Sequence, residues 1–314
     1  MPGDKRCFVV EEGENPSTDY FVMPFLREQG YTPLRRTFSQ LPTAGELQGA
    51  TVVFVRYLPG PWRALVTQHR AAIAGLYLFM DDDLFDWRAF IGMPLRYQAK
   101  LLRLTWRHRG WLRSQGAKLL VSTPYLQSKY AHWQPQLLPA RPPELMLAGA
   151  ATAESPPVMT VFYHGSASHG ADLRWLRPVI AEVLERNEKL VFEVIGNAAL
   201  NRLFRGLPRV HVLHPMKWPT YRALVQRPGR TIGLAPLLDN RFNRARAHTK
   251  FFDITLAGAV GVYARGDIYG DIVRDGDNGL LVPMEQGAWV EAILRLADDA
   301  ALRQRLLEGA RACL

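Results

Sequence analysis

One pattern runs through the whole sequence: a short run of β-branched and aromatic residues, followed by a longer stretch with helical periodicity. In the first half, the strand-like runs are residues 5–10, 50–58, 76–80 and 118–123. In the second half, they are residues 158–165, 190–196, 210–215, 231–237 and 260–264. Strands that alternate with helices in this way are typical of parallel βαβ units, with helices on both faces of the sheet. The sequence therefore predicts an α/β fold with parallel, doubly wound sheets.

A segment rich in proline and small residues, 139–157, interrupts this alternation near the middle of the chain. Such a composition is typical of an interdomain linker, and 314 residues are many for a single core. We expect two Rossmann-like domains, an N-terminal one over residues 1–145 and a C-terminal one over 158–314, joined by a linker over 146–157. Because ligands of such sheets bind beyond the carboxyl ends of the strands, we expect the site in a cleft that the domains face.

The chain is strongly basic, with a formal net charge of +10 and a pI of about 9.8. This charge favours anionic partners, but no zinc-finger spacing or RNA-recognition motif accompanies it, so we expect no nucleic acid partner. Cys7 and Cys313 fit no metal-ligand spacing and indicate a reducing compartment. We see neither a signal peptide nor an apolar run of transmembrane length, and expect a soluble, cytoplasmic protein.

The most informative stretch is residues 232–264, where a strand-like run is followed by a basic loop and then by a helix that opens near His248. A helix N-terminus presents free N–H groups and a partial positive charge, which suit phosphate. Cations at this place would neutralise the charge on a departing nucleoside diphosphate without a metal. Four cations gather around this helix start: Arg241, Arg244, Arg246 and Lys250.

This stretch resembles the donor-binding segment of the group 1 family of nucleotide-sugar glycosyltransferases, which have the GT-B fold. In many bacterial members the segment runs Asn, two residues, Lys-Ser, two residues, Lys, two residues, Glu. Here Asn243, Arg246, Ala247, Lys250 and Asp253 stand at the same spacing. The resemblance implies that Arg246 and Lys250 contact the donor diphosphate and that Asp253 holds the ribose hydroxyls. Three positions depart from the family pattern: Arg246 replaces lysine, Ala247 replaces serine and Asp253 replaces glutamate. These departures bear on which donor the protein binds.

The resemblance continues over the rest of the second half. Residues 161–184 resemble the first strand, glycine-bearing loop and first helix of the family's donor domain. Gly165 would let the backbone approach the donor, and Ser166 would donate to phosphate oxygens. His169 would supply a proton or a hydrogen bond near the leaving group, or is a loop residue without a role in the reaction. Two further segments resemble the family: residues 192–197 and 267–283.

The N-terminal half offers two basic features. Arg56 lies where a strand-like run ends, either as a cation for an anionic acceptor or as an ordinary surface arginine. Residues 96–124 form a basic, tryptophan-bearing amphipathic stretch. This stretch would face an anionic membrane or a lipid-linked acceptor, or its long basic side chains would simply cover a face packed on the sheet.

Three consecutive carboxylates, Asp81, Asp82 and Asp83, follow the strand-like run 76–80. In metal-dependent transferases the ion bridges the diphosphate, so its ligands belong to the donor domain. Here the diphosphate-binding features come after residue 160, so we expect no metal. Two alternatives remain: a catalytic, acceptor-facing cluster in which crowded charge raises one pKa, or the cap of a helix.

The leading hypothesis is a retaining, metal-independent glycosyltransferase without a cofactor. It would move a sugar from a nucleotide-sugar donor to a hydroxyl of a glycan or lipid-linked acceptor, in surface polysaccharide or glycolipid synthesis. It would work in the cytoplasm, with peripheral contact at the anionic inner face of the membrane. The alternatives are a nucleotide-sugar epimerase of the same fold and a catalytically lapsed accessory protein of a glycan-assembly complex.

Overall fold

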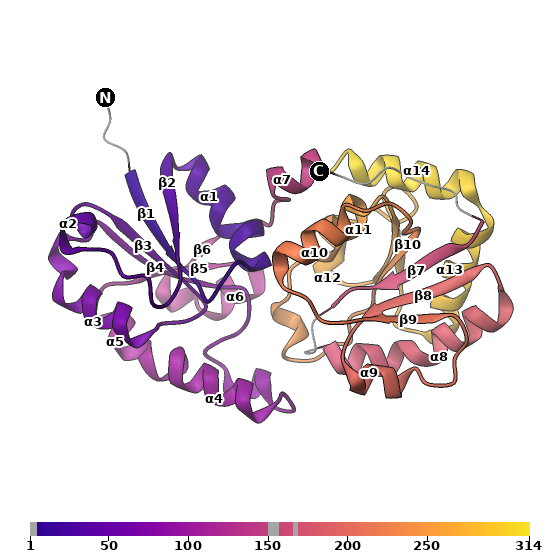
Figure 1. The fold of residues 1–314 in the computed structure, drawn as a ribbon, viewed down its shortest axis with the longest axis horizontal. Coiled ribbons are helices and arrows are strands. Elements are labelled where there is room, and N and C mark those ends of the chain that lie inside the picture. The colour runs from indigo at the N-terminus through magenta and orange to yellow at the C-terminus, as the bar shows by residue number, and fades with distance from the viewer. Residues whose placement is uncertain (1–4, 150–156, 166–168) are drawn as a thin grey trace. The chain divides into compact units, whose positions relative to one another are not determined.

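The computed structural model describes residues 5–149, 157–165 and 169–314 (Figure 1). The chain divides into two compact units. The first unit is Met1–Arg141 together with Asn240–Ala247, and the second unit is Pro142–Asp239 together with His248–Leu314. The chain therefore enters the first unit twice, and each unit is described by itself below.

The first unit is built on a six-stranded parallel sheet with the strand order β2-β1-β3-β4-β5-β6. Its strands are β1 (Lys5–Val10), β2 (Tyr31–Arg36), β3 (Thr51–Val55), β4 (Gly75–Met80), β5 (Lys118–Val121) and β6 (Gln136–Leu137). Its α-helices are α1 (Met23–Glu28), α2 (Ala44–Leu47), α3 (Gly60–Gln68), α4 (Leu95–Leu104), α5 (Arg109–Ser114) and α6 (Pro124–Lys129). Its shorter helical turns are η1 (Thr18–Val22), η2 (Arg70–Ala72), η3 (Trp87–Phe90), η4 (Trp106–His108), η5 (Ala131–Trp133) and η7 (Asn243–Ala245).

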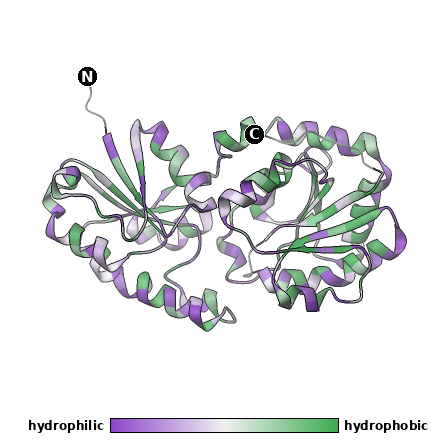
Figure 2. Cartoon of the chain, viewed as in Figure 1, coloured by the Kyte–Doolittle hydropathy of each residue, from purple (hydrophilic) through white to green (hydrophobic). Residues whose placement is uncertain are grey.

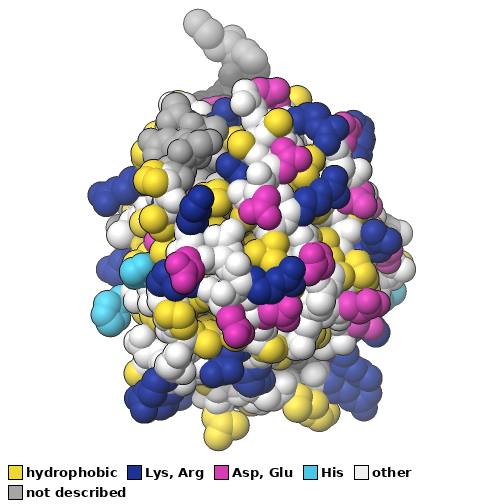
Figure 3. Space-filling model, turned by 90° about the vertical axis from the view of Figure 1, so that its right-hand side faces the viewer, with side chains coloured by type: hydrophobic (Ala, Val, Ile, Leu, Met, Phe, Trp, Pro, Cys, Tyr) yellow, Lys and Arg dark blue, Asp and Glu magenta, His cyan; other side chains and the backbone are white. Residues whose placement is uncertain are grey.

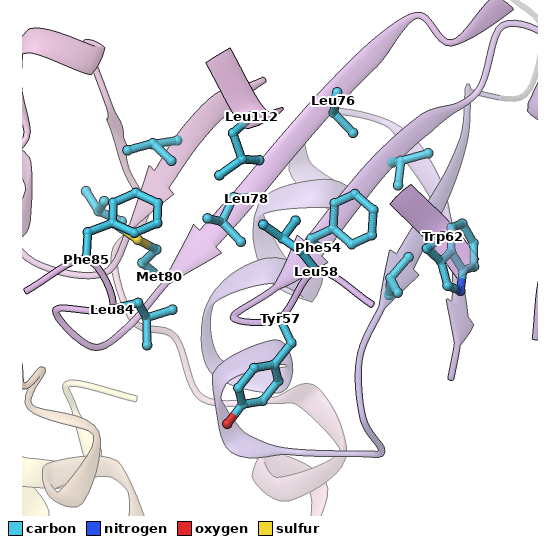
Figure 4. Packing of buried hydrophobic residues seen from close by; sticks show 14 of the residues in the cluster. Phe54, Tyr57, Leu58, Trp62, Leu76, Leu78, Met80, Leu84, Phe85 and Leu112 are labelled. Atoms are coloured by element: carbon cyan, nitrogen blue, oxygen red, sulfur yellow. The ribbon is translucent and has the colours of Figure 1, made fainter. Parts of the chain in front are cut away.

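The core of the first unit lies between the sheet and the helices that pack on it (Figure 4). Phe54 of β3 makes edge-to-face contacts with Trp62 of α3 and Trp111 of α5, with ring centroids 6.3 and 6.2 Å apart. Phe242 and Ala245 belong to the same buried cluster, although the sequence places them far from the rest of this unit. The segment 240–247 is thus part of the core of the first unit.

The second unit is built on another six-stranded parallel sheet, with the order β12-β11-β10-β7-β8-β9. Its strands are β7 (Met159–Tyr163), β8 (Leu190–Ile195), β9 (Val210–Leu213), β10 (Ile232–Ala235), β11 (Val260–Ala264) and β12 (Leu280–Val282). Its helices are α7 (Glu144–Ala148), α8 (Gly170–Arg186), α9 (Ala198–Leu203), α10 (Trp218–Val225), α11 (Thr249–Leu256), α12 (Asp267–Gly270), α13 (Gln286–Asp298) and α14 (Ala300–Arg311). In Figure 1, α8 and α9 lie on one side of this sheet and α10 and α11 on the other.

The nine strand-like runs of the sequence are all strands in the structure, and the predicted doubly wound α/β fold is confirmed. The sequence did not predict β2, because Pro33, Arg35 and Arg36 break the apolar pattern of this partly exposed edge strand. The helix α7 overlaps the start of the predicted linker 146–157, while residues 150–156 of that linker lie outside the described residues.

Candidate functional site

The strand order of the second sheet reverses between β7 and β10. In open α/β sheets, ligands bind at such a switch point, beyond the carboxyl ends of the strands. The chain leaves β7 through His164 and Gly165, and it leaves β10 toward Leu238. Asp172, in the first turn of α8, accepts a hydrogen bond of 3.0 Å from the amide of Leu238. Asp172 thereby links the loop after β10 to the helix that follows β7. These two segments border a candidate site.

Gly165 and Lys250 meet at one aromatic ring in this candidate site. A Cβ atom on Gly165 would lie 2.7 Å from the ring of Tyr163, so a larger residue at this position would displace that ring. The ammonium group of Lys250, in the first turn of α11, lies 5.3 Å from the centroid of the same ring. Two of the residues that the sequence predicted to contact a donor are therefore brought together around Tyr163.

His169 also lies near the ring of Tyr163. Its imidazole centroid is 6.4 Å from that of Tyr163, and its Nδ1 atom is 2.9 Å from Oδ2 of Asp172. The carboxylate favours a proton on Nδ1, which puts Nε2 of a neutral imidazole in its acceptor form. Ser166, which was also predicted to bind phosphate, lies outside the described residues.

Asp253 lies one helical turn beyond Lys250 and accepts a hydrogen bond from the hydroxyl of Tyr221. The Tyr221 ring stacks on Trp218 at 5.6 Å and meets the imidazole of His164 edge-on at 5.6 Å. Burial, followed by the charge of Asp253, raises the pKa of Tyr221, so the phenol keeps its proton and donates. A carboxylate has about four lone-pair sites and can accept hydrogen bonds from more than one donor.

His164 extends this cluster toward β8. Its Nε2 atom lies 3.0 Å from Oε1 of Glu193, and the same oxygen accepts a hydrogen bond of 2.7 Å from Nε of Arg230. Burial lowers the pKa of His164 although the bond to Glu193 opposes that shift. Burial raises the pKa of Glu193, but the bonds from His164 and Arg230 outweigh it and the net shift is downward. A neutral imidazole thus donates to an ionised carboxylate.

The low pKa of His164 predicts acid sensitivity of the second unit. Below about pH 6.5, the ordinary value for histidine, the unfolded chain binds a proton that folded His164 does not, so stability falls as the pH drops. We expect the melting temperature to fall between pH 7 and pH 5.5, and to fall less in His164→Gln. Removal of the exposed histidine in His211→Gln is the control, and it should leave the pH dependence as in the parent protein. Equal pH dependence in all three proteins would contradict the prediction.

In the first unit, Asp81 and Asp82 share a cation at the carboxyl end of β4. Asp81 accepts a hydrogen bond from the hydroxyl of Ser17 and lies 3.4 Å from Nε of Arg56. Asp82 pairs with Nη2 of Arg56 and, at 2.9 Å, with Nη1 of Arg246. The side chain of Asp82 is 2% exposed and that of Asp81 14% exposed, so Asp81 is the more accessible of the two.

Asp83 has partners of its own. It pairs with Lys129 and accepts a hydrogen bond from the hydroxyl of Tyr130. Burial raises the pKa of Asp83, and these two hydrogen bonds only partly offset the shift. The next carboxylate, Asp86, binds Lys129 at 2.7 Å and caps η3 by accepting from the amide of Arg88 at 3.0 Å. Helix capping in this acidic run is thus carried out by Asp86, while Asp83 lies in a buried polar cluster.

Arg56 adopts a left-handed backbone conformation, with φ of +66°, directly after β3. This conformation costs about 1 kcal/mol for a residue with a side chain. Its contacts offset the cost: Nη2 donates to the hydroxyl of Tyr97 at 2.8 Å, and its carbonyl accepts from the hydroxyl of Thr105 at 2.7 Å. Burial lowers the pKa of Arg56, but the charges of Asp81 and Asp82 raise it to a greater extent. An anionic acceptor at Arg56 would compete with these two carboxylates.

The segment 240–247 is held by buried contacts inside the first unit. Asn243 is buried, and the guanidinium of Arg246 lies 3.9 Å from the centroid of the Phe242 ring while it pairs with Asp82. The four positions that the sequence grouped as donor contacts are therefore divided between the units. Asn243 and Arg246 belong to the first unit, and Lys250 and Asp253 to the second. Their roles in donor binding stay predictions.

Two features are absent from the part of the chain that the structure describes. No group of three His, Cys, Asp or Glu side chains there is placed to hold a metal ion. Among the same residues, no helix combines the length and the apolar character needed to span a bilayer.

The two units define the architecture of the chain. The order 2-1-3-4-5-6 in the first sheet is the flavodoxin-like order 2-1-3-4-5 with β6 added at one edge, and the order 3-2-1-4-5-6 in the second is the Rossmann order. Two Rossmann-like units in one chain are the components of the GT-B fold.

Solved structures confirm this fold. A glycosyltransferase from Rickettsia africae is similar with a TM-score of 0.66, at 10% identity over 99% of this chain and 93% of that one. TarM from S. aureus, solved with UDP, alpha-GlcNAc-glycerol and fondaparinux, has a TM-score of 0.57 at 11% identity over 85% of this chain. The match covers 52% of TarM, so the chain spans about half the length of that protein.

The same fold also occurs in a second class of enzyme. A protein from Listeria monocytogenes, assigned as a UDP-N-acetylglucosamine 2-epimerase, has a TM-score of 0.53 at 7% identity, over 98% of this chain and 92% of that one. No protein-family model matches the sequence, and no curated protein sequence matches it.

Sequence reasoning missed several residues that build the candidate site. Tyr163, Asp172, Tyr221 and Trp218 position the predicted residues but carry no motif of their own. The one signal available for Asp172 is its spacing of three residues from His169 across a helix start. Tyr221 comes from α10, and its contact with α11 could not be read from sequence spacing.

Proposed function

We propose that the protein is a glycosyltransferase that binds a nucleotide-sugar donor at the carboxyl edge of the second sheet. The observation that carries the proposal is the pair formed by Lys250 and Asp253 on one face of α11, beside the loop that contains Gly165. A cation in the first turn of a helix suits a diphosphate, and a carboxylate one turn later suits vicinal ribose hydroxyls. The similar fold of TarM, solved with UDP, supports this choice of ligand.

The residues of this edge would act mainly through charge and position. Lys250 and the N-terminus of α11 would neutralise the charge that grows on the departing diphosphate, a role that needs no metal. His169, oriented by Asp172, would hydrogen-bond near the leaving group. In a retaining reaction the acceptor attacks from the face that the diphosphate leaves, and the departing phosphate oxygen takes the hydroxyl proton. The protein then contributes alignment of the two substrates.

We assign the acceptor to the first unit, as a glycan or a lipid-linked glycan of surface polysaccharide or glycolipid synthesis at the inner face of the membrane. Among the three consecutive aspartates, Asp81 is the candidate to contact the acceptor hydroxyl, because its side chain is 14% exposed while those of Asp82 and Asp83 are almost fully buried. Arg56 would then hold Asp81 in place at 3.4 Å.

The second candidate function is a nucleotide-sugar epimerase, which the similar fold of the Listeria protein favours. An epimerase consumes its donor without an acceptor, whereas a transferase releases nucleoside diphosphate only as sugar is transferred. The assay follows both the release of nucleoside diphosphate and the conversion of the sugar in a panel of nucleotide sugars, with and without glycan acceptors; a changed sugar without an acceptor would indicate an epimerase. An accessory protein that has lost catalysis would release no nucleotide in either case.

Binding of a nucleoside diphosphate tests the proposed site directly. We expect UDP or another nucleoside diphosphate to bind in calorimetry, and Lys250→Ala to weaken that binding about tenfold, because a charge-assisted contact contributes about 1.5 kcal/mol or more. The matched control is Lys189→Ala, which removes an exposed lysine of the same unit and should leave the affinity unchanged. Absence of binding, or equal affinities in the parent protein and Lys250→Ala, would overturn the assignment.

A further inference from the structure

An exposed apolar strip with basic borders runs along η3, the loop after it and α4 in the first unit. The structure leaves eight large hydrophobic side chains exposed among the residues it describes, and four of them fall here. They are Trp87, Ile91, Leu95 and Leu102, which are 58%, 65%, 80% and 45% exposed. We call this strip the α4 face.

The geometry of α4 shows that these residues are not a displaced part of the core. With 3.6 residues per turn, Tyr97, Leu101 and Leu104 fall on one side of the helix, and this side packs on the core of the unit. Leu95 and Leu102 fall on the other side, together with the exposed Ala99. The helix therefore has two apolar sides, and only one of them packs against the core of the first unit. Figure 2 shows hydrophobic and hydrophilic residues mixed along its length.

The sequence around the α4 face is rich in positive charge, although Glu12 pairs with Lys100 of α4 and Asp86 caps η3. No aspartate or glutamate occurs between residues 87 and 143, while this stretch holds ten of the chain's lysines and arginines, a number equal to the formal net charge of +10. The face of the molecule in Figure 3, in contrast, shows acidic and basic side chains interspersed. Six arginines of the stretch are exposed, and no described carboxylate pairs with any of them: Arg88, Arg96, Arg103, Arg107, Arg109 and Arg113.

We propose that the α4 face binds the surface of an anionic lipid bilayer. An interfacial helix buries an apolar side below the headgroups, while arginines beside it reach anionic headgroups. Leu95 and Leu102 supply the apolar side, and each is followed directly by an arginine, Arg96 or Arg103. A tryptophan such as Trp87 suits the level of the headgroups. A nucleic acid would satisfy the arginines but would leave Ile91 and Leu95 without apolar partners, which is why the bilayer is the better match.

This surface differs from the membrane-facing helix that the sequence suggested over residues 96–124. Trp106 and Trp111 of that stretch are only partly exposed, and their indole N–H groups donate to the carbonyl of Phe85 and the hydroxyl of Thr67. The apolar contribution comes instead from Trp87, Ile91 and Leu95, which lie before or at the start of α4, and from Leu102 within the stretch.

Flotation of the full chain with vesicles tests the proposal. We expect binding to phosphatidylcholine vesicles that contain phosphatidylglycerol, weaker binding to pure phosphatidylcholine, and loss of binding as salt is raised. Leu95→Gln should weaken binding about tenfold, as expected for one buried leucine. The double variant Arg96→Gln/Arg103→Gln should weaken binding to the anionic vesicles only. Leu145→Gln, at another exposed leucine, in the second unit, is the control and should bind as the parent protein does.

Two results would overturn the proposal. One is vesicle binding that is absent or is unaffected by both sets of substitutions. The other is preferential binding of duplex DNA or RNA that the arginine substitutions abolish and Leu95→Gln leaves intact, which would assign the face to nucleic acid. Nucleotide-diphosphate binding, measured on the same proteins, should not change. Membrane binding and the proposed transferase activity therefore stand or fall separately.

Discussion

Substitution of Asp82 by asparagine is expected to lower the free energy of unfolding of the first unit by about 2 to 3 kcal/mol. The change removes the carboxylate that pairs with Arg56 and Arg246 while it keeps the shape of the side chain. Loss of one partner from a fully buried pair costs about 3 to 5 kcal/mol. The expected value is smaller because the two arginine side chains are 21% and 20% exposed, and because Asp81 remains beside Arg56.

The effect must be measured for each unit separately, because a single unfolding free energy is not defined for a two-unit chain. Hydrogen exchange of peptides from β3 and β4 reports on the first unit, and peptides from β7 and β8 report on the second. Exchange should rise in the first pair and stay unchanged in the second. Glu28→Gln, which breaks the exposed pair with Arg141, is the control and should change stability by less than about 1 kcal/mol. Unchanged exchange in β3 and β4 of Asp82→Asn would show that these ion pairs contribute little.

Substitution of Asp253 by asparagine is expected to weaken binding of a nucleoside diphosphate about thirtyfold. Ribose hydroxyls would then donate to a neutral amide oxygen, and each of two charge-assisted hydrogen bonds would lose about 1 kcal/mol. Folding should be preserved, because the amide oxygen can still accept the hydrogen bond from Tyr221. Calorimetry gives the affinity, and the melting temperature without ligand checks the fold.

The matched control for Asp253 removes the partner and keeps the charge. Tyr221→Phe retains the ring that stacks on Trp218 and meets His164, but it takes away the hydroxyl that binds Asp253. We expect it to weaken nucleotide binding by about threefold or less. If both variants weakened binding equally, or if Asp253→Asn had no effect on binding, Asp253 would be a structural residue and the ribose would be held elsewhere.

The fold could be predicted from the sequence because strands buried on both faces leave continuous apolar runs. The residues of β3 are all buried, and its sequence is apolar except for Thr51. Edge strands do not need a continuous apolar run. β2 pairs with β1 on one side only, so Pro33 and two arginines are compatible with it, and its sequence does not read as a strand.

The site could be predicted only where its residues share one continuous element. Lys250 and Asp253 both lie on α11, so helical spacing related them correctly. Arg246 was expected in the same set, but its backbone is extended, with φ of −74° and ψ of +147°, and α11 begins only at Thr249. The chain direction changes between these positions, and the spacing of the motif therefore says nothing about where the side chain of Arg246 points.

The three consecutive aspartates show another limit of the sequence. Their mutual repulsion is visible in the sequence, but the cations that stabilise them are not, because Arg56, Lys129 and Arg246 come from distant positions in the chain. Crowding suggested a raised pKa for one of them, and the pKa of Asp83 is raised, mainly through burial. The burial that raises the pKa of Asp83 can be seen only in the folded structure.

The return of residues 240–247 to the first unit has a consequence for biosynthesis. Phe242 and Ala245 complete its buried cluster, and Arg246 supplies a counter-charge for Asp82. Domains generally fold as units, N-terminal first, as the chain is made. Here the N-terminal unit cannot reach its final packing until the ribosome has also made β7, β8, β9 and β10 of the other unit. During that interval the core of the first unit lacks Phe242 and Ala245, and Asp82 has Arg56 beside it but not yet Arg246.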